Sequence, residues 1–237
     1  MASPHLIFVE GIPGTGKTVT SKHIAKHLVS LGEQVRLYGE FDQDNPIRTV
    51  WTEALHFPWS SYLLDDKSPD TVTNVPPVYI PVQWKALALQ CKISRETVIL
   101  ESRYIQNSVQ LLFLFGAPVQ TIRDCFMEIN SILEQFDPLL VYLQPVDLAR
   151  TVRCTLKERG NPWASWIIDR FTRSPWCVSQ GLSGEEGIVA FYQAWELIAS
   201  DLYLMHQGPT IKLVDPQKDW SGTYERMKTA VRHISTI

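Results

Sequence analysis

A glycine-rich stretch near the start of the chain holds the residues best suited to chemistry. It reads GIPGTGKT and matches the pattern G-x-x-x-x-G-K-[ST] at every fixed position. Glycines in such a turn adopt positive φ angles and have no Cβ, so backbone N–H groups can approach an anion closely. The lysine brings positive charge to the β- and γ-phosphates of a nucleotide, and the threonine hydroxyl is a magnesium ligand. We therefore predict a binding loop for ATP and Mg²⁺ that consists of Gly11, Ile12, Pro13, Gly14, Thr15, Gly16, Lys17 and Thr18.

The segments on either side of this loop fit that prediction. Residues 6–9 form a short apolar run, typical of a strand that is buried on both faces of a parallel sheet. Residues 19–31 have helical periodicity, and Gly32 follows where a C-terminal cap belongs. Strand, loop and helix thus occur in the order that phosphate binding requires. The alternative is a glycine-rich turn that matches the pattern by chance.

The rest of the chain alternates apolar runs with segments of helical periodicity. This alternation predicts an α/β fold, with a five-stranded parallel sheet and helices on both faces. At 237 residues we expect a single domain over 1–237. The further strands are expected at residues 34–38, 97–100, 139–143 and 210–214, and the further helices at 82–94, 109–115, 119–136, 147–159, 162–173, 183–206 and 221–234.

Two segments depart from this regular alternation. A proline-rich insert at about 56–81 follows a short helix expected around 47–55, and it is either a flap over the substrate or a surface excursion. The segment at about 147–162 follows a strand and is rich in arginine, which makes it a candidate lid.

Composition narrows the class of protein further. The formal net charge of -3 gives no sign of an electrostatic nucleic-acid binder. The four cysteines lie far apart without a C-x-x-C pair, so neither a zinc site nor a disulfide framework is indicated. The start of the chain does not resemble a signal peptide, and the apolar runs are too short to span a bilayer. We expect a cytoplasmic protein that binds neither nucleic acid nor membrane, with its eight tryptophans in the core and surface grooves rather than in an aromatic substrate site.

Charged residues directly follow two of the expected strands, where they would face a ligand crevice. Glu101 is the candidate second magnesium ligand beside Thr18, or else a charge at a helix start. Glu40 can accept a proton from an acceptor hydroxyl or bind the substrate, or it is a solvated turn residue. Arg103 is placed to contact an acceptor phosphate or carboxylate through two parallel hydrogen bonds.

A basic helix surface supplies the last group of candidates. Arg150, Arg153 and Lys157 are spaced by three and four residues, and Arg159 follows them. We interpret these side chains as lid residues that close over the phosphates and exclude water, although such charges also occur on solvated helix faces.

The succession FVEGIPGTGKT, LYGEFD, VILESRY, VYLQPVDLARTVRCTLKERG and IKLVDPQKDW resembles the P-loop kinases of the thymidylate and deoxynucleoside kinase group. The resemblance implies a P-loop NTPase fold of the nucleoside or nucleotide kinase type. Arg103 and the tyrosine after it resemble the Asp-Arg-Tyr signature of thymidylate kinases, with Ser102 in place of the aspartate. Glu101 resembles the glutamate of the Glu-Arg-Ser signature of deoxynucleoside kinases, with Ser102 between it and the arginine.

The same resemblance implies roles for other residues. Glu40 would handle the substrate, and Arg153 and Arg159 would be the lid arginines that contact phosphates. Residues 215–216 correspond to a loop near the adenine. Residues 83–84 lie on the helix that commonly lines the acceptor pocket, although an ordinary packed helix is the simpler interpretation.

These observations favour an ATP-dependent phosphotransferase that moves the γ-phosphate to a small-molecule acceptor, such as a nucleoside or nucleotide. The alternatives are a phosphotransferase of another hydroxylated metabolite or antibiotic, a nucleotide-dependent switch, and a scaffold that binds nucleotide without turnover. The sequence contains no Asn-Lys-x-Asp stretch of the kind that reads guanine in GTP-binding switches. A homodimer is the candidate assembly, and the choice between ATP and GTP stays open.

Overall fold

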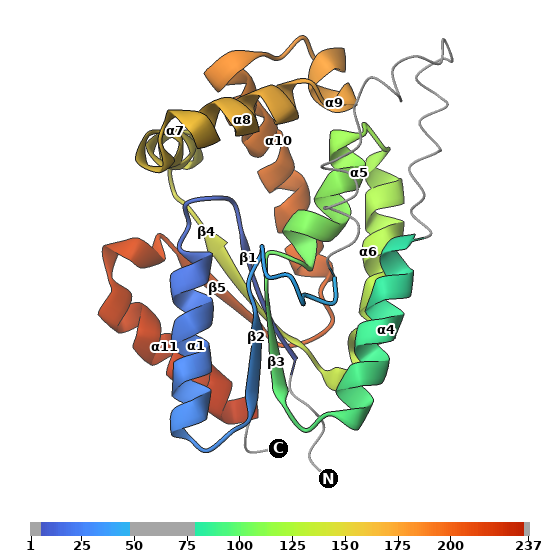
Figure 1. The fold of residues 1–237 in the computed structure, drawn as a ribbon, viewed down its shortest axis with the longest axis vertical. Helices are drawn as coiled ribbons and strands as arrows, with labels where there is room; N and C mark the ends of the chain where they lie inside the picture. Colours follow the sequence, from blue (N-terminus) through green and yellow to red (C-terminus); the bar gives the residue numbers. More distant parts are fainter. Residues whose placement is uncertain (1–5, 48–78, 235–237) are drawn as a thin grey trace.

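A parallel β-sheet forms the centre of the molecule. The computed structural model describes residues 6–47 and 79–234, and its five strands are all parallel, in the order β2-β3-β1-β4-β5 (Figure 1). The predicted α/β class and five-stranded parallel sheet are confirmed. The strands are β1 (Leu6–Gly11), β2 (Val35–Tyr38), β3 (Thr97–Glu101), β4 (Leu139–Gln144) and β5 (Thr210–Val214).

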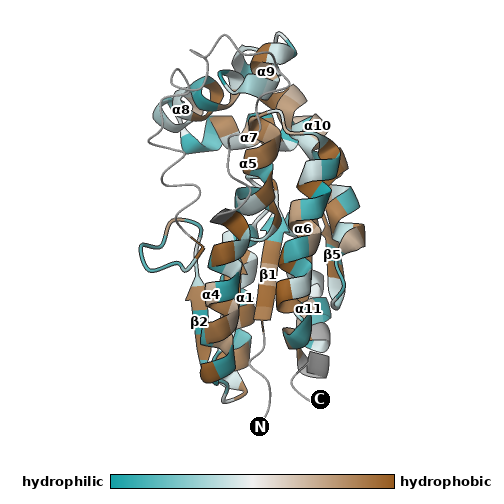
Figure 2. Ribbon diagram, turned by 90° about the vertical axis from the view of Figure 1, so that its right-hand side faces the viewer, coloured by the Kyte–Doolittle hydropathy of each residue, from teal (hydrophilic) through white to brown (hydrophobic). Residues whose placement is uncertain are grey.

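Helices cover both faces because successive strand residues point in opposite directions. In β1, Ile7 and Val9 pack with α1 (Lys17–Ser30) and α11 (Trp220–Ile234). Leu6 and Phe8 join the larger core on the other face. Figure 2 shows β1 mostly hydrophobic, as expected of a strand between two helical layers, and its apolar run LIFV precedes Glu10. The larger core is covered by α4 (Tyr79–Ile93), α5 (Gln110–Leu114), α6 (Val119–Leu133) and α10 (Gly184–Met205).

Three further helices lie beyond the end of the sheet at which the strand β1 leads into the glycine-rich loop (Figure 1). They are α7 (Leu148–Arg159), α8 (Asn161–Thr172) and α9 (Pro175–Ser179). Phe171 of α8 packs on Phe191 and Tyr192 of α10, with ring centroids 4.9 and 5.7 Å apart. The sequence did not indicate α9, a short helix with Ser174 as its N-cap. The candidate lid segment therefore corresponds to α7 and the start of α8.

Several helix boundaries differ by one to three residues from those predicted, as at the end of α6, which is Leu133 rather than 136. Helix α4 begins at Tyr79 rather than at 82, because Pro81 lies in its first turn, where a missing N–H costs no helical hydrogen bond. The helix expected at 109–115 is preceded by a π-helical turn, η2 (Ile105–Val109). The helix expected around 47–55 and the proline-rich insert fall almost entirely outside the described residues. Among residues 6–47 and 79–234, no helix combines the length and apolar character needed to cross a membrane.

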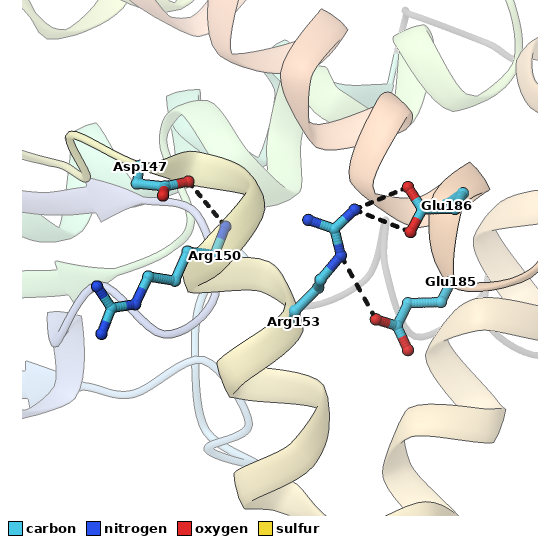
Figure 3. Close-up of polar contacts among 5 residues, drawn as sticks. All are labelled: Asp147, Arg150, Arg153, Glu185 and Glu186. Atoms are coloured by element: carbon cyan, nitrogen blue, oxygen red, sulfur yellow. Dashed lines mark hydrogen bonds and ion pairs between the residues drawn. The ribbon is translucent and has the colours of Figure 1, made fainter.

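Asp147 determines where α7 begins. Its carboxylate oxygen Oδ1 accepts a hydrogen bond from the backbone N–H of Arg150 at 2.9 Å (Figure 3). An N-cap of this kind satisfies a donor that the helix itself leaves unpaired. We expect Asp147→Ala to lower the free energy of unfolding by about 1 kcal/mol, as measured by urea denaturation. Asp147→Asn keeps the acceptor and should stay close to the original protein, whereas equal stability of all three proteins would contradict the assigned cap.

Candidate functional site

The loop between β1 and α1 has a conformation that requires glycine at two positions, 14 and 16. Gly14 and Gly16 have φ angles of +86° and +96°, which side chains rarely adopt. A Cβ on Gly14 would overlap the Thr155 hydroxyl of α7. One on Gly16 would lie 2.7 Å from the Trp220 ring of α11. Side chains of α7 and α11 thus contact the loop from two sides, and the remaining side of the loop lines an open space.

That space is a cleft of about 760 Å³. It lies between the loop, the segments that follow β2 and β3, and the helices α7 and α8. Of the predicted loop residues, the cleft is lined by Pro13, Gly14, Gly16, Lys17 and Thr18. Gly11, Ile12 and Thr15 are buried behind it.

Lys17 is a buried cation in the lining of the cleft, as is Arg103. Only 6% of Lys17 is exposed, and its Nζ donates a hydrogen bond to the Ile12 carbonyl oxygen at 3.0 Å. Burial lowers the pKa of Lys17, while the carboxylates of Glu40, Glu101 and Glu10 act in the opposite direction. Its neighbours are therefore arranged to favour the charged ammonium in spite of its burial.

Thr18 and Glu101 form the candidate magnesium site. The Thr18 hydroxyl donates to Glu101 Oε1 at 2.5 Å, and the Ser21 hydroxyl lies 3.4 Å from Oε2. Burial raises the pKa of Glu101, and Thr18 and Lys17 counteract the rise. No cluster of three or more His, Cys, Asp or Glu side chains suited to a metal occurs within the described residues. Hydroxyl and carboxylate oxygens fit Mg²⁺, which usually takes few protein ligands and completes its shell with water and substrate phosphates.

The predicted acceptor residues Glu40 and Arg103 are brought together. The Arg103 guanidinium donates to the backbone carbonyl oxygen of Glu40. Asn107, which sequence reasoning missed, donates from Nδ2 to Glu40 Oε1 at 3.2 Å. All three line the cleft. The polar residues that follow β3 in the run ESRYIQN were the signal for Asn107.

Arg153 and Arg159, the two lid arginines that the family resemblance implies, lie in different surroundings. Arg159 lines the cleft, and its guanidinium lies 4.5 Å from the centre of the Trp163 ring. Arg153 bonds instead to both carboxylate oxygens of Glu186 at 2.8 Å, with Glu185 3.6 Å away (Figure 3). It is not among the described residues that line the cleft. The structure therefore brings Arg159, but not Arg153, to the other candidate residues.

Aromatic side chains line part of the cleft, and we call this surface the aromatic wall. Sequence reasoning missed it, because it treated the tryptophans mainly as packing residues. That reading holds for Trp84, which is fully buried and packs edge-on against Phe8. The aromatic residues that line the cleft are Phe41, Trp163, Trp166, Phe171 and Tyr192.

The loop after β5 reaches the cleft through Gln217, whereas the predicted residues 215–216 are not among the described residues that line it. Asp215 accepts a hydrogen bond from the Val146 backbone N–H at 2.8 Å, which fixes the loop to the end of β4. Gln217 lines the cleft and donates from its side-chain amide to the Gly14 carbonyl oxygen.

No family model matches this chain, and no curated protein matches it either.

Proposed function

We propose that the protein is an ATP-dependent phosphotransferase with a P-loop NTPase fold, and that it transfers the γ-phosphate to a hydroxyl group of a small molecule. One observation carries the proposal. Lys17, the Thr18–Glu101 pair and the Glu40–Arg103 pair come from distant segments of the chain but line the same cleft. Phosphoryl transfer needs the same three functions: a cradle for the phosphates, a magnesium site and a group that positions the acceptor.

The glycine loop and Lys17 would hold the triphosphate. Backbone N–H groups of residues 14–17, in the loop and at the start of α1, would bind the β-phosphate, where the helix dipole favours negative charge. The Ile12 carbonyl oxygen that Lys17 contacts is neutral, so a phosphate oxygen is the stronger partner for the ammonium. Thr18 and Glu101 would hold Mg²⁺, which neutralises part of the triphosphate charge.

Glu40 and Arg103 would serve the acceptor. The oxygen of the acceptor hydroxyl would form a bond to the γ-phosphorus while the bond from that phosphorus to the leaving oxygen of ADP breaks. The Glu40 carboxylate would accept the proton that the hydroxyl loses. Arg103 holds the Glu40 backbone, which keeps this carboxylate at the edge of the cleft. The aromatic wall offers flat apolar surface for the body of the acceptor.

The proposal is tested by incubating the protein with γ-labelled ATP, Mg²⁺ and a panel of acceptors. The panel should contain nucleosides, nucleoside monophosphates and hydroxylated antibiotics and metabolites, which separates the nucleoside kinase from the other phosphotransferases. Label should pass to one acceptor class and should require Mg²⁺. Failure of the protein to bind ATP at millimolar concentration would overturn the proposal.

The two lid arginines should differ in their effect on transfer. We expect Arg159→Ala to reduce kcat/KM for ATP by about thirtyfold, because it removes a cation that can bond to a charged phosphate. Arg153→Ala should change kcat/KM by less than about threefold, because its partners are exposed carboxylates on α10. Steady-state kinetics measure kcat/KM for ATP in both variants. A larger decrease in Arg153→Ala than in Arg159→Ala would contradict the assignment of Arg159 as the arginine that contacts the phosphates.

A further inference from the structure

Glu10 is a fully enclosed carboxylate directly before the glycine loop. It is the fifth residue of β1, precedes Gly11, and has 0% of its surface exposed. Oε1 accepts a hydrogen bond from the backbone N–H of Tyr104 at 2.7 Å, and Oε2 accepts one from that of Gln106 at 2.9 Å. Both of its oxygens are therefore bonded to the backbone of a single segment, the one that follows β3.

That segment carries much of the acceptor side of the cleft. Arg103, Gln106 and Asn107 all line the cleft, and Arg103 and Asn107 both bond to Glu40. The segment leaves β3 through Ser102 in the left-handed region, with φ +59°, and continues as the π-helical turn η2. The first N–H groups of a helical turn have no partner within it, and Glu10 supplies acceptors for two N–H groups here.

We propose that Glu10 is a positioning residue, whose carboxylate fixes the backbone of residues 103–107 to β1 and thereby holds Arg103 and Asn107 on Glu40. The inference deepens the proposed phosphotransferase function, and its effect on kinetics rests on that function. The effect of Glu10 on the backbone of residues 103–107 does not depend on that function. The ionised carboxylate matches two N–H donors, whereas a protonated carboxyl group turns one of its oxygens into a donor.

Protonation of Glu10 should therefore release the segment near neutral pH. Burial raises the pKa of Glu10 to about 7, against the opposing effects of the Gln106 and Tyr104 N–H groups and of Lys17. The other titratable groups that interact with it are the phenols of Tyr104 and Tyr142, whose pKa values burial raises well above 10. The two N–H groups lower the pKa of Glu10 relative to an equally buried carboxyl group without them, so these two hydrogen bonds favour the ionised form and weaken as the pH falls through about 7. Burial alone acts in the opposite direction and favours the protonated form.

Amide hydrogen exchange on the unmodified protein directly tests the two hydrogen bonds from the Tyr104 and Gln106 N–H groups to Glu10. Between pH 8 and pH 6, protection factors of the Tyr104 and Gln106 amides should fall by about tenfold, which corresponds to the loss of one hydrogen bond. Amides in β4 should keep theirs. Protection of Tyr104 and Gln106 that does not change with pH over this range would overturn the inference.

A matched pair of variants tests the consequence for the site. Glu10→Gln turns one acceptor into a donor that faces a backbone N–H, so protection should be lost at one of the two amides and should no longer depend on pH at either. Glu196→Gln is the control, because burial also raises the pKa of Glu196, but its carboxylate bonds to the side chains of Tyr142 and Gln144 and does not line the cleft.

Kinetics then separate positioning from general stability. Glu10→Gln should raise the KM for the acceptor by about tenfold, the equivalent of one hydrogen bond, and leave the KM for ATP within about threefold. Equal effects of Glu10→Gln and Glu196→Gln would overturn the positioning role. If Glu10→Gln does not fold, exchange in the unmodified protein still decides. If the unmodified protein transfers no phosphate, the proposed function fails, while the exchange result still supports or overturns the role of Glu10.

Discussion

Replacement of Lys17 by alanine is expected to reduce the rate of phosphoryl transfer by about a thousandfold. The expectation follows from the loss of a buried, preorganised cation that would stabilise charge on the transferring phosphoryl group. The fold should survive, because Lys17 is not the only donor to its present partner. The Ile12 carbonyl oxygen also accepts a hydrogen bond from the Thr15 hydroxyl at 2.8 Å.

The measurement is single-turnover transfer from labelled ATP, combined with circular dichroism and urea denaturation to establish that the variant is folded. Lys26→Ala is the matched control, because Lys26 lies on the same helix but is exposed and outside the described lining of the cleft. A folded Lys17→Ala protein with unchanged turnover would refute the role assigned to Lys17.

Glu101→Gln is expected to lower turnover by about a hundredfold at moderate magnesium concentration and to raise the half-saturating Mg²⁺ concentration by at least about tenfold. The glutamine keeps an oxygen that can accept the Thr18 hydroxyl but lacks the negative charge that a divalent cation requires. Because burial raises the pKa of Glu101, protonation has the same effect as the substitution. The apparent affinity for Mg²⁺ should therefore fall as the pH decreases.

Titration of activity with Mg²⁺ at several pH values checks this prediction. Glu96→Gln provides the control, because Glu96 directly precedes β3, whereas Glu101 is the last residue of that strand. A Glu101→Gln protein with the same magnesium requirement as the control would exclude Glu101 as a metal ligand.

The sheet and the glycine loop could be predicted because their signals are local. The apolar runs of β1, β3 and β4 are buried on both faces, and charged residues after the strands gather at one edge of a parallel sheet by geometry alone. The pairs Thr18–Glu101 and Glu40–Arg103 follow from that geometry.

Other features depend on contacts between distant segments and could not be read from the sequence. Helical spacing suggests a shared face for Arg150 and Arg153, but their side chains extend to different sides of α7 (Figure 3). The direction of Arg153 is determined by Glu185 and Glu186 at the start of α10. The π-helical turn after β3 depends likewise on Glu10, a residue of another strand.

The confinement of the glycine loop has a consequence for biosynthesis. Residues 11–18 leave the ribosome long before the side chains that contact the loop from two sides, Thr155 of α7 and Trp220 of α11. A nascent chain that does not yet include Trp220 lacks the ring that packs against Gly16 and helps to hold this turn. Nucleotide capture should thus become available only after α11 has been translated and can dock.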